Sequence, residues 1–106
     1  MIQKIEISSW GQFVDKVLDY DGIIFAYFYA EWCGPCRRAK HSIEKLSETY
    51  KVVGIDVDKC LDVSRKMAIT SIPTVIAFNK GNEISKKIGI SSHTDYLEMA
   101  DGQKNI

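Results

Sequence analysis

Two cysteines three residues apart stand where an apolar segment gives way to a helical one. Residues 23–29 form an uninterrupted apolar run, which is typical of a central strand buried on both faces of a sheet. Beyond this run, apolar side chains recur with the spacing of a helix, at Cys36, Ala39, Ile43, Leu46 and Tyr50. The sequence therefore predicts a strand that leads into a helix, with Cys33 and Cys36 at the junction.

A junction of this kind favours thiol chemistry. The unpaired N–H groups and the positive dipole end of a helix start stabilise an anion, and they lower the pKa of a cysteine placed there, here Cys33. Pro35 suits the first helical turn, where its missing N–H costs nothing, and Gly34 leaves the backbone beside Cys33 open to an incoming chain. Cys36 lies one turn further on the same side, within reach of a small-ring disulfide. We expect Cys36 to point inward and Cys33 to lie at an exposed tip.

Half of a zinc site is the alternative interpretation of the cysteine pair. The sequence holds neither a second Cys-x-x-Cys nor a closely spaced histidine pair, so a tetrahedral zinc site would lack two ligands. Three cysteines are also too few for a structural disulfide framework, which indicates a reducing environment and thiols kept for reactivity. We expect a redox-active pair with no metal and no cofactor.

Length and charge exclude other classes of function. The 106 residues predict a single domain, residues 1–106. Lys plus Arg and Asp plus Glu balance at 14 each, so no net charge attracts nucleic acid or an anionic membrane. No apolar run approaches the roughly 20 residues of a membrane span, and the N-terminal residues lack the pattern of a signal peptide. We expect a cytoplasmic monomer, although an apolar surface around the cysteines leaves a dimer open.

Strand and helix patterns alternate along the chain. The expected strands are residues 4–7, 23–29, 51–58, 75–78 and 83–88. Four helices are expected. The first is capped by Ser9, the second begins at Cys33, the third is capped by Asp58, and the fourth runs from Ser92 to Gly102. The order βαβαβαββα predicts an α/β fold, a central mixed β-sheet of about five strands flanked by four helices.

The segment Trp32-Cys33-Gly34-Pro35-Cys36 resembles the redox site of the reducing members of the thioredoxin family, and the resemblance covers nearly the whole chain. It implies the thioredoxin fold and a protein-disulfide oxidoreductase that acts mainly as a reductant and electron carrier. In this resemblance Cys33 is the nucleophile, Cys36 resolves the mixed disulfide, and the internal Cys33–Cys36 disulfide remains. The implied partners are disulfide-containing proteins as substrates and an NADPH-dependent thioredoxin reductase.

A second segment, Ile72-Pro73-Thr74, resembles the cis-proline segment that faces the cysteine pair in thioredoxins. The residues alone leave a plain trans proline open at this point. A cis bond would expose the Ile72 backbone for strand-like pairing with a substrate, and the resemblance places Gly89 in the neighbouring loop. The expected docking patch consists of Trp32, Gly34, Pro35, Ile72, Pro73 and Gly89, with an ordinary core tryptophan as the alternative for Trp32.

The chain departs from the family pattern at three positions. Tyr27 stands where most thioredoxins bury an aspartate, Gly54 where bacterial members often carry its lysine partner, and His41 where the family has a helix-kinking proline. Without that proline, the helix loses the usual cause of its kink. These departures keep a second hypothesis open, a binding module that uses the docking patch without turnover.

Three further features require an interpretation. Cys60 shares a helical stripe with Val63 and Met67, so we interpret it as a small buried hydrophobe rather than a regulatory thiol. His93 is expected at the surface. The exposed face of the helix after Cys36 is basic and could favour acidic partners, through Arg37, Arg38, Lys40, His41 and Lys45.

Overall fold

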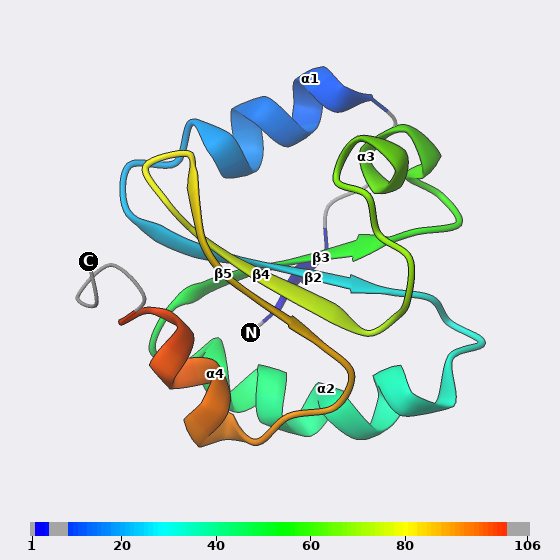
Figure 1. The fold of residues 1–106 in the computed structure, drawn as a ribbon, viewed down its shortest axis with the longest axis vertical. Helices are drawn as coiled ribbons and strands as arrows, with labels where there is room; N and C mark the ends of the chain where they lie inside the picture. The colour runs from blue at the N-terminus through cyan, green and yellow to red at the C-terminus, as the bar shows by residue number, and fades with distance from the viewer. Residues whose placement is uncertain (1, 5–8, 102–106) are drawn as a thin grey trace.

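Strand β2 (Ile23–Tyr29) is the centre of a five-stranded sheet in the computed structural model, which describes residues 2–4 and 9–101 (Figure 1). The strand order is β1-β3-β2-β4-β5. Strands β1 (Gln3–Lys4) and β3 (Lys51–Asp56) run parallel to β2, whereas β4 (Thr74–Asn79) is antiparallel to it, and β5 (Asn82–Ile88) forms the far edge. The predicted mixed sheet is confirmed.

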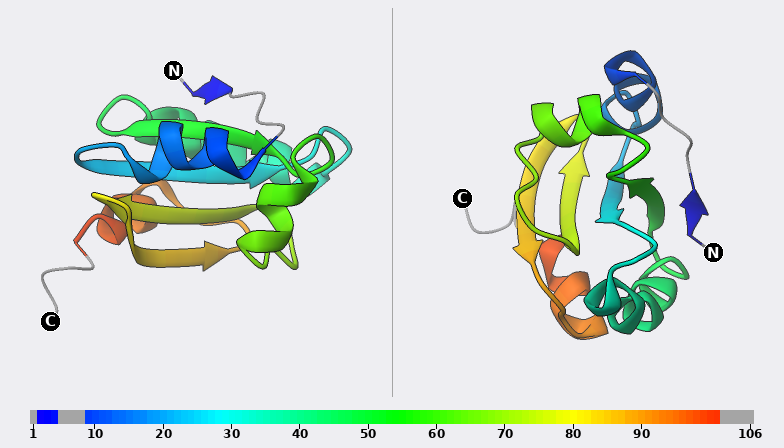
Figure 2. Two further views of the ribbon diagram at one scale, coloured as in Figure 1. Left: turned by 90° about the horizontal axis from the view of Figure 1, so that it is seen from above. Right: turned by 90° about the vertical axis from the view of Figure 1, so that its right-hand side faces the viewer.

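Helices cover both faces of this sheet (Figures 1 and 2). Helix α1 (Trp10–Phe13), its π-helical continuation η1 (Val14–Leu18) and α3 (Leu61–Lys66) lie over one face. Helices α2 (Gly34–Leu46) and α4 (His93–Met99) lie over the other. The four predicted helices are therefore present, and α2 is the one that leaves the C-terminal end of β2.

The apolar run of β2 supplies both layers of the core. Successive side chains of a strand point to opposite faces, so Phe25 and Tyr27 pack with α2 and α4. Ile24, Ala26 and Phe28 pack with α1 and α3. All five side chains are buried, which confirms the prediction of a central strand covered on both sides.

Local signals place the helix starts. The Oγ of Ser9 accepts the N–H of Gln12 at 3.4 Å, and the Oγ of Ser92 accepts the N–H of Asp95 at 3.1 Å. Each bond satisfies one of the donors that a helix start leaves unpaired, so both predicted caps are confirmed. The stripe that α2 turns to the sheet is also buried as predicted, at Cys36, Ala39, Ile43 and Leu46.

The segment after β3 differs from the prediction. β3 ends at Asp56 rather than residue 58, and Asp58 does not cap α3, whose N-cap residue is Cys60. The reason is a turn centred on Asp56: its Oδ1 accepts the N–H of Asp58 at 2.9 Å, and its carbonyl accepts the N–H of Cys60 at 2.9 Å. This turn uses the residues that we expected to extend the strand and begin the helix.

Two other boundaries also differ or remain open. α2 ends at Leu46, so Tyr50 lies beyond the helix and reaches the core by packing its ring 5.4 Å from that of Phe25. Most of the strand expected at residues 4–7 and the helix end expected at Gly102 lie outside the described residues. Within the described part of the chain, no helix has the length and hydrophobicity needed to cross a membrane.

Candidate active site

Cys33 and Cys36 lie where the chain passes from β2 into α2. Cys33 is the N-cap residue of α2, with an extended backbone, and its Sγ accepts the N–H of Cys36 at 3.1 Å. A disulfide joins the two cysteines, whose Cα atoms are 5.2 Å apart. Pro35 lies in the first turn, where no N–H is needed. The sulfur of Cys33 thus accepts a backbone N–H of the first turn of α2. A thiolate is stabilised at this position.

The burial of the pair differs from expectation. Cys33 is only 3% exposed and Cys36 only 2%, so Cys33 is not an exposed tip in this disulfide form. Cys33 packs against Ala30, and its Sγ lies 3.9 Å from the carbonyl oxygen of Ile72. That neighbour is 39 residues away in sequence, so the helix pattern alone could not reveal it.

The segments predicted to form the docking patch meet beside Cys33. The Ile72–Pro73 bond is cis, and the Pro73 carbonyl accepts the N–H of Gly89 at 2.8 Å. Gly89 has φ of +89°, and a Cβ built on it would meet nothing within 4 Å, so its missing side chain leaves open space. A docking patch requires exposed residues. Pro73 does not fit this requirement, because it is buried.

Trp32 is the exposed part of the site. It is 68% exposed, which contradicts the alternative of a core tryptophan. Its Nε1–H donates to Oδ2 of Asp58 at 2.7 Å, so the indole is tied to the loop that follows β3. This role of Asp58 was not predicted. The available signal was its place after a parallel strand next to β2, because side chains at the carboxyl ends of adjacent parallel strands meet at one edge.

Tyr27 lies beneath the cysteine pair. Its hydroxyl donates to the carbonyl oxygen of Cys36 at 2.9 Å, and the side chain is 4% exposed. Burial, followed by the nearby Tyr96 and Tyr29, raises the pKa of Tyr27 to about 12. In the sheet register Tyr27 is paired with Gly54, so two of the three positions that depart from the family pattern are direct neighbours. The group next to Cys36 is therefore a neutral donor and not a base.

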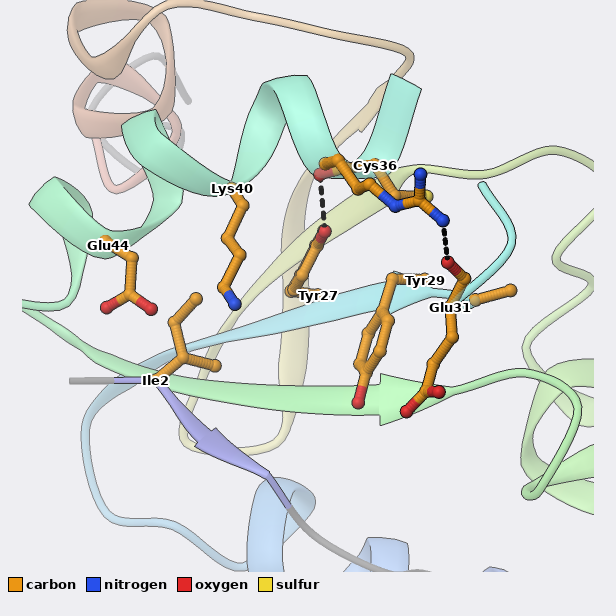
Figure 3. Close-up of a pocket in the computed structure, with 9 residues that line it drawn as sticks. Ile2, Tyr27, Tyr29, Glu31, Cys36, Lys40 and Glu44 are labelled. Carbon is orange, nitrogen blue, oxygen red and sulfur yellow. Dashed lines mark hydrogen bonds between the residues drawn. The ribbon is translucent and has the colours of Figure 1, made fainter. Parts of the chain in front are cut away.

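A pocket of about 330 Å³ opens on this hydrogen bond (Figure 3). Its walls are mainly apolar, and the rings of Tyr27 and Tyr29 stack there with their centroids 5.1 Å apart. Four charged residues complete the lining, Glu31, Arg37, Lys40 and Glu44. The pocket gives solvent a route to the neighbourhood of Cys36.

The remaining candidate residues lie away from the disulfide. α2 continues without a break through His41, which is exposed. Cys60 is 2% exposed and packs in the core with Val63, so its interpretation as a buried hydrophobe is confirmed. His93 is half-buried, and its Nε2 is buried without a hydrogen-bond partner among the described residues, so the surface expectation was wrong. The described residues also contain no group of three His, Cys, Asp or Glu side chains able to hold a metal ion.

Comparison with known proteins gives consistent matches. A family model described as thioredoxin matches residues 4–101. Thioredoxin-1 of Saccharomyces cerevisiae is 37% identical over 78 residues, which cover 71% of this chain and 76% of that protein. The crystal structure of Malassezia sympodialis thioredoxin is 29% identical with a TM-score of 0.79, over 96% of this chain and 90% of that one. Chloroplastic thioredoxin z is 26% identical with a TM-score of 0.82, over 99% and 96% of the two chains.

Proposed function

This chain belongs to the thioredoxin family and is a protein-disulfide oxidoreductase, and on that premise we propose that it acts mainly as a reductant, with Cys33 as nucleophile and Cys36 as resolving thiol. The observation that carries these roles is the hydrogen bond from the N–H of Cys36 to the sulfur of Cys33 at the start of α2. The bond and the helix dipole favour the thiolate at Cys33. Cys36 is one turn inside the helix, against the neutral hydroxyl of Tyr27.

The reaction consists of two exchange steps. The Cys33 thiolate attacks one sulfur of a substrate disulfide; the substrate S–S bond breaks, a mixed disulfide forms, and the first substrate sulfur leaves as a thiolate that takes a proton. Cys36 then loses its proton and attacks the sulfur of Cys33. The mixed disulfide breaks, the Cys33–Cys36 bond forms, and the second substrate thiolate leaves. This chain gives two electrons to the substrate. The two substrate thiolates take up two protons, one equivalent to the proton that Cys36 loses and one from solvent.

The docking patch provides a surface on which a substrate could approach Cys33. Trp32 and Pro35 are exposed beside the disulfide, Ile72 is partly buried, and Gly89 leaves open space next to it. We propose that a substrate chain lies across these residues and pairs with the Ile72 backbone. Pro73 is buried, so its part in this patch is the cis bond to Ile72 and the hydrogen bond from its carbonyl to Gly89.

Re-reduction requires an external donor of two electrons. The family is generally reduced by thioredoxin reductase, so we propose an NADPH-dependent thioredoxin reductase as the partner. We also propose that the chain is a monomer of the cytoplasm. A reducing compartment fits three cysteines of which two form the redox pair and one is buried in the core.

Reduction of insulin disulfides with NADPH and a thioredoxin reductase tests the proposal. Cys33→Ser should abolish turnover, because no nucleophile remains. Cys36→Ser should stop after the first step and accumulate a mixed disulfide through Cys33, detectable by mass spectrometry. Wild-type turnover by Cys36→Ser would show that the roles are wrongly assigned. Binding of substrates without any reduction by the unmodified chain would instead favour the alternative of a binding module.

A further inference from the structure

Positive charge is concentrated on one helix of a chain that is neutral overall. Lys plus Arg and Asp plus Glu both number 14 in the whole sequence. Helix α2 holds four Lys and Arg residues and a single carboxylate, Glu44. The rest of the chain consequently has an excess of carboxylates, and α2 carries a local excess of positive charge that the chain as a whole lacks.

Three of the four cations of α2 gather with His41 on its outer face. Arg37, His41 and Lys45 follow one another at intervals of four residues, which places them on one ridge about 12 Å long. Arg38 lies beside this ridge. All four side chains are exposed. We refer to Arg37, Arg38, His41 and Lys45 as the basic face.

The basic face begins at the disulfide itself. Nη1 of Arg38 would lie 3.9 Å from a Cβ placed on Gly34, so the guanidinium reaches the residue between the two cysteines. Nη2 of Arg37 donates to the carbonyl oxygen of Glu31 at 2.8 Å, which fixes the second guanidinium at the start of the redox segment. A guanidinium has five donors in a fixed fork that matches a carboxylate, so each arginine keeps donors for a bound chain.

Nearby carboxylates only partly oppose this charge. The carboxylate of Asp58 is engaged by the indole N–H of Trp32, at 2.7 Å. Glu31 is exposed and stands before the disulfide, whereas the ridge extends away from it along α2. An approaching chain therefore meets two arginines at the disulfide and further positive charge along the helix.

We propose that the basic face selects disulfide substrates with Asp or Glu residues beside the disulfide. This inference rests on the proposed function and adds the class of substrate to it. Complementary charge at a surface acts mainly by raising the association rate, and salt weakens the effect because it screens exposed charges. Selection should thus appear in kcat/KM and should fall as ionic strength rises.

Three synthetic disulfide peptides, identical except for the residues flanking the disulfide, provide the test. The flanking residues are Glu, Gln or Lys, and each rate is divided by the rate with tris(3-hydroxypropyl)phosphine, whose attacking group is uncharged, to remove differences in intrinsic reactivity. At low ionic strength the wild-type chain should reduce the Glu peptide about tenfold more efficiently than the Lys peptide. At high salt the ratio should approach one.

A pair of variants with the same change in net charge locates the effect. Arg38→Glu should bring the Glu-to-Lys ratio to one or below. Lys16→Glu should keep the wild-type ratio, because Lys16 is exposed on η1, over the opposite face of the sheet (Figure 1). Arg38→Gln should fall between the wild type and Arg38→Glu, and thermal melts of all variants confirm that each is folded.

The outcomes separate the two proposals. Failure of the unmodified chain to reduce even the Gln peptide would overturn the proposed function. Reduction of all three peptides with equal efficiency at low salt would overturn the charge selection alone. An equal loss of preference in Lys16→Glu and Arg38→Glu would also overturn it, since net charge and not the basic face would then be responsible.

Discussion

At the scale of single residues, Tyr27 places a neutral hydroxyl and not a base beside Cys36, the proposed resolving cysteine. Its hydroxyl donates to the Cys36 carbonyl, and its pKa of about 12 keeps it protonated near neutral pH. It therefore cannot accept the proton of Cys36 in the way that a buried carboxylate is thought to do in the family. The pocket beside Tyr27 offers water as the acceptor, and the departing substrate thiolate offers another. Resolution should consequently depend steeply on pH.

Substitution of Tyr27 tests both its packing and its charge. Tyr27→Asp should lower the free energy of unfolding by a few kcal/mol, because it removes a buried ring and leaves a carboxyl next to Gly54 with no lysine. The added negative charge should also raise the pKa of Cys33 and flatten the pH dependence of resolution. Denaturant unfolding and titration of thiolate absorbance measure the two effects.

Tyr27→Phe is the matched control for this experiment. It keeps the ring and removes only the hydrogen bond to the Cys36 carbonyl, so it should cost about 1 kcal/mol and leave the Cys33 pKa close to that of the wild type. A Cys33 pKa that stays unchanged or falls in Tyr27→Asp would contradict the electrostatic argument. Unchanged stability in both variants would contradict the packing of Tyr27.

The thiols of Cys33 and Cys60 should differ in reactivity despite similar burial. Both residues are N-cap positions and nearly inaccessible, but only the sulfur of Cys33 accepts a helix N–H. Cys60 lies in the apolar core, which disfavours a thiolate. In the reduced protein, iodoacetamide should modify Cys33 at least tenfold faster than Cys60. Mass spectrometry showing Cys60 modified first would revive a regulatory role for that thiol.

At the scale of elements, the turn between β4 and β5 depends on one glycine. Lys80 and Gly81 have φ of +50° and +84°, the left-handed conformation at both central positions that a two-residue hairpin turn favours. A Cβ on Gly81 would lie 2.7 Å from the carbonyl oxygen of Leu18, the last residue of η1. The end of η1 therefore packs directly against this turn. Strain and contact therefore act together at this position.

Gly81→Ala should destabilise the fold by about 1–3 kcal/mol, because the substitution adds backbone strain and forces η1 away from the turn. Denaturant unfolding measures the change. Gly11→Ala is the control, since its Cβ would meet only the Oγ of Ser9, at 3.9 Å, and alanine favours a helix. A midpoint for Gly81→Ala equal to that of Gly11→Ala would show that the turn yields without cost.

At the scale of the whole molecule, the sequence predicted what local patterns determine. The apolar run of β2, the buried stripe of α2 and the caps at Ser9 and Ser92 each depend on neighbouring residues, and each is confirmed. The family motif supplied the cysteine pair and the neighbouring cis proline.

What the sequence did not predict depends on contacts between distant segments. Distant Ile72 contributes to the burial of Cys33, and the turn at Asp56 leaves Asp58 free to bind Trp32. The pocket requires Ile2 to meet residues of β2 and α2. Such contacts are set by the packing of the whole sheet, so no local spacing indicates them.

The layer between the sheet and helices α2 and α4 also determines how the fold responds to alkali. Tyr27, Tyr29 and Tyr96 all belong to this layer, and burial is the main cause that raises the pKa of each above its ordinary value near 10. In the unfolded chain these phenols ionise near pH 10. The folded state therefore retains protons that the unfolded state has already lost.

Stability should consequently be full below about pH 10 and should decline toward pH 12, the pKa of Tyr27 in the fold. For Tyr27 alone, a shift of this size corresponds to about 3 kcal/mol. Denaturant midpoints measured across this pH range, together with tyrosinate absorbance, test the expectation, and Tyr27→Phe should show a smaller decline than the wild type. A midpoint that stayed constant up to pH 12 would contradict this expectation. So would a decline in Tyr27→Phe as steep as that of the wild type, because the hydroxyl of Tyr27 would then not be the group that limits stability in alkali.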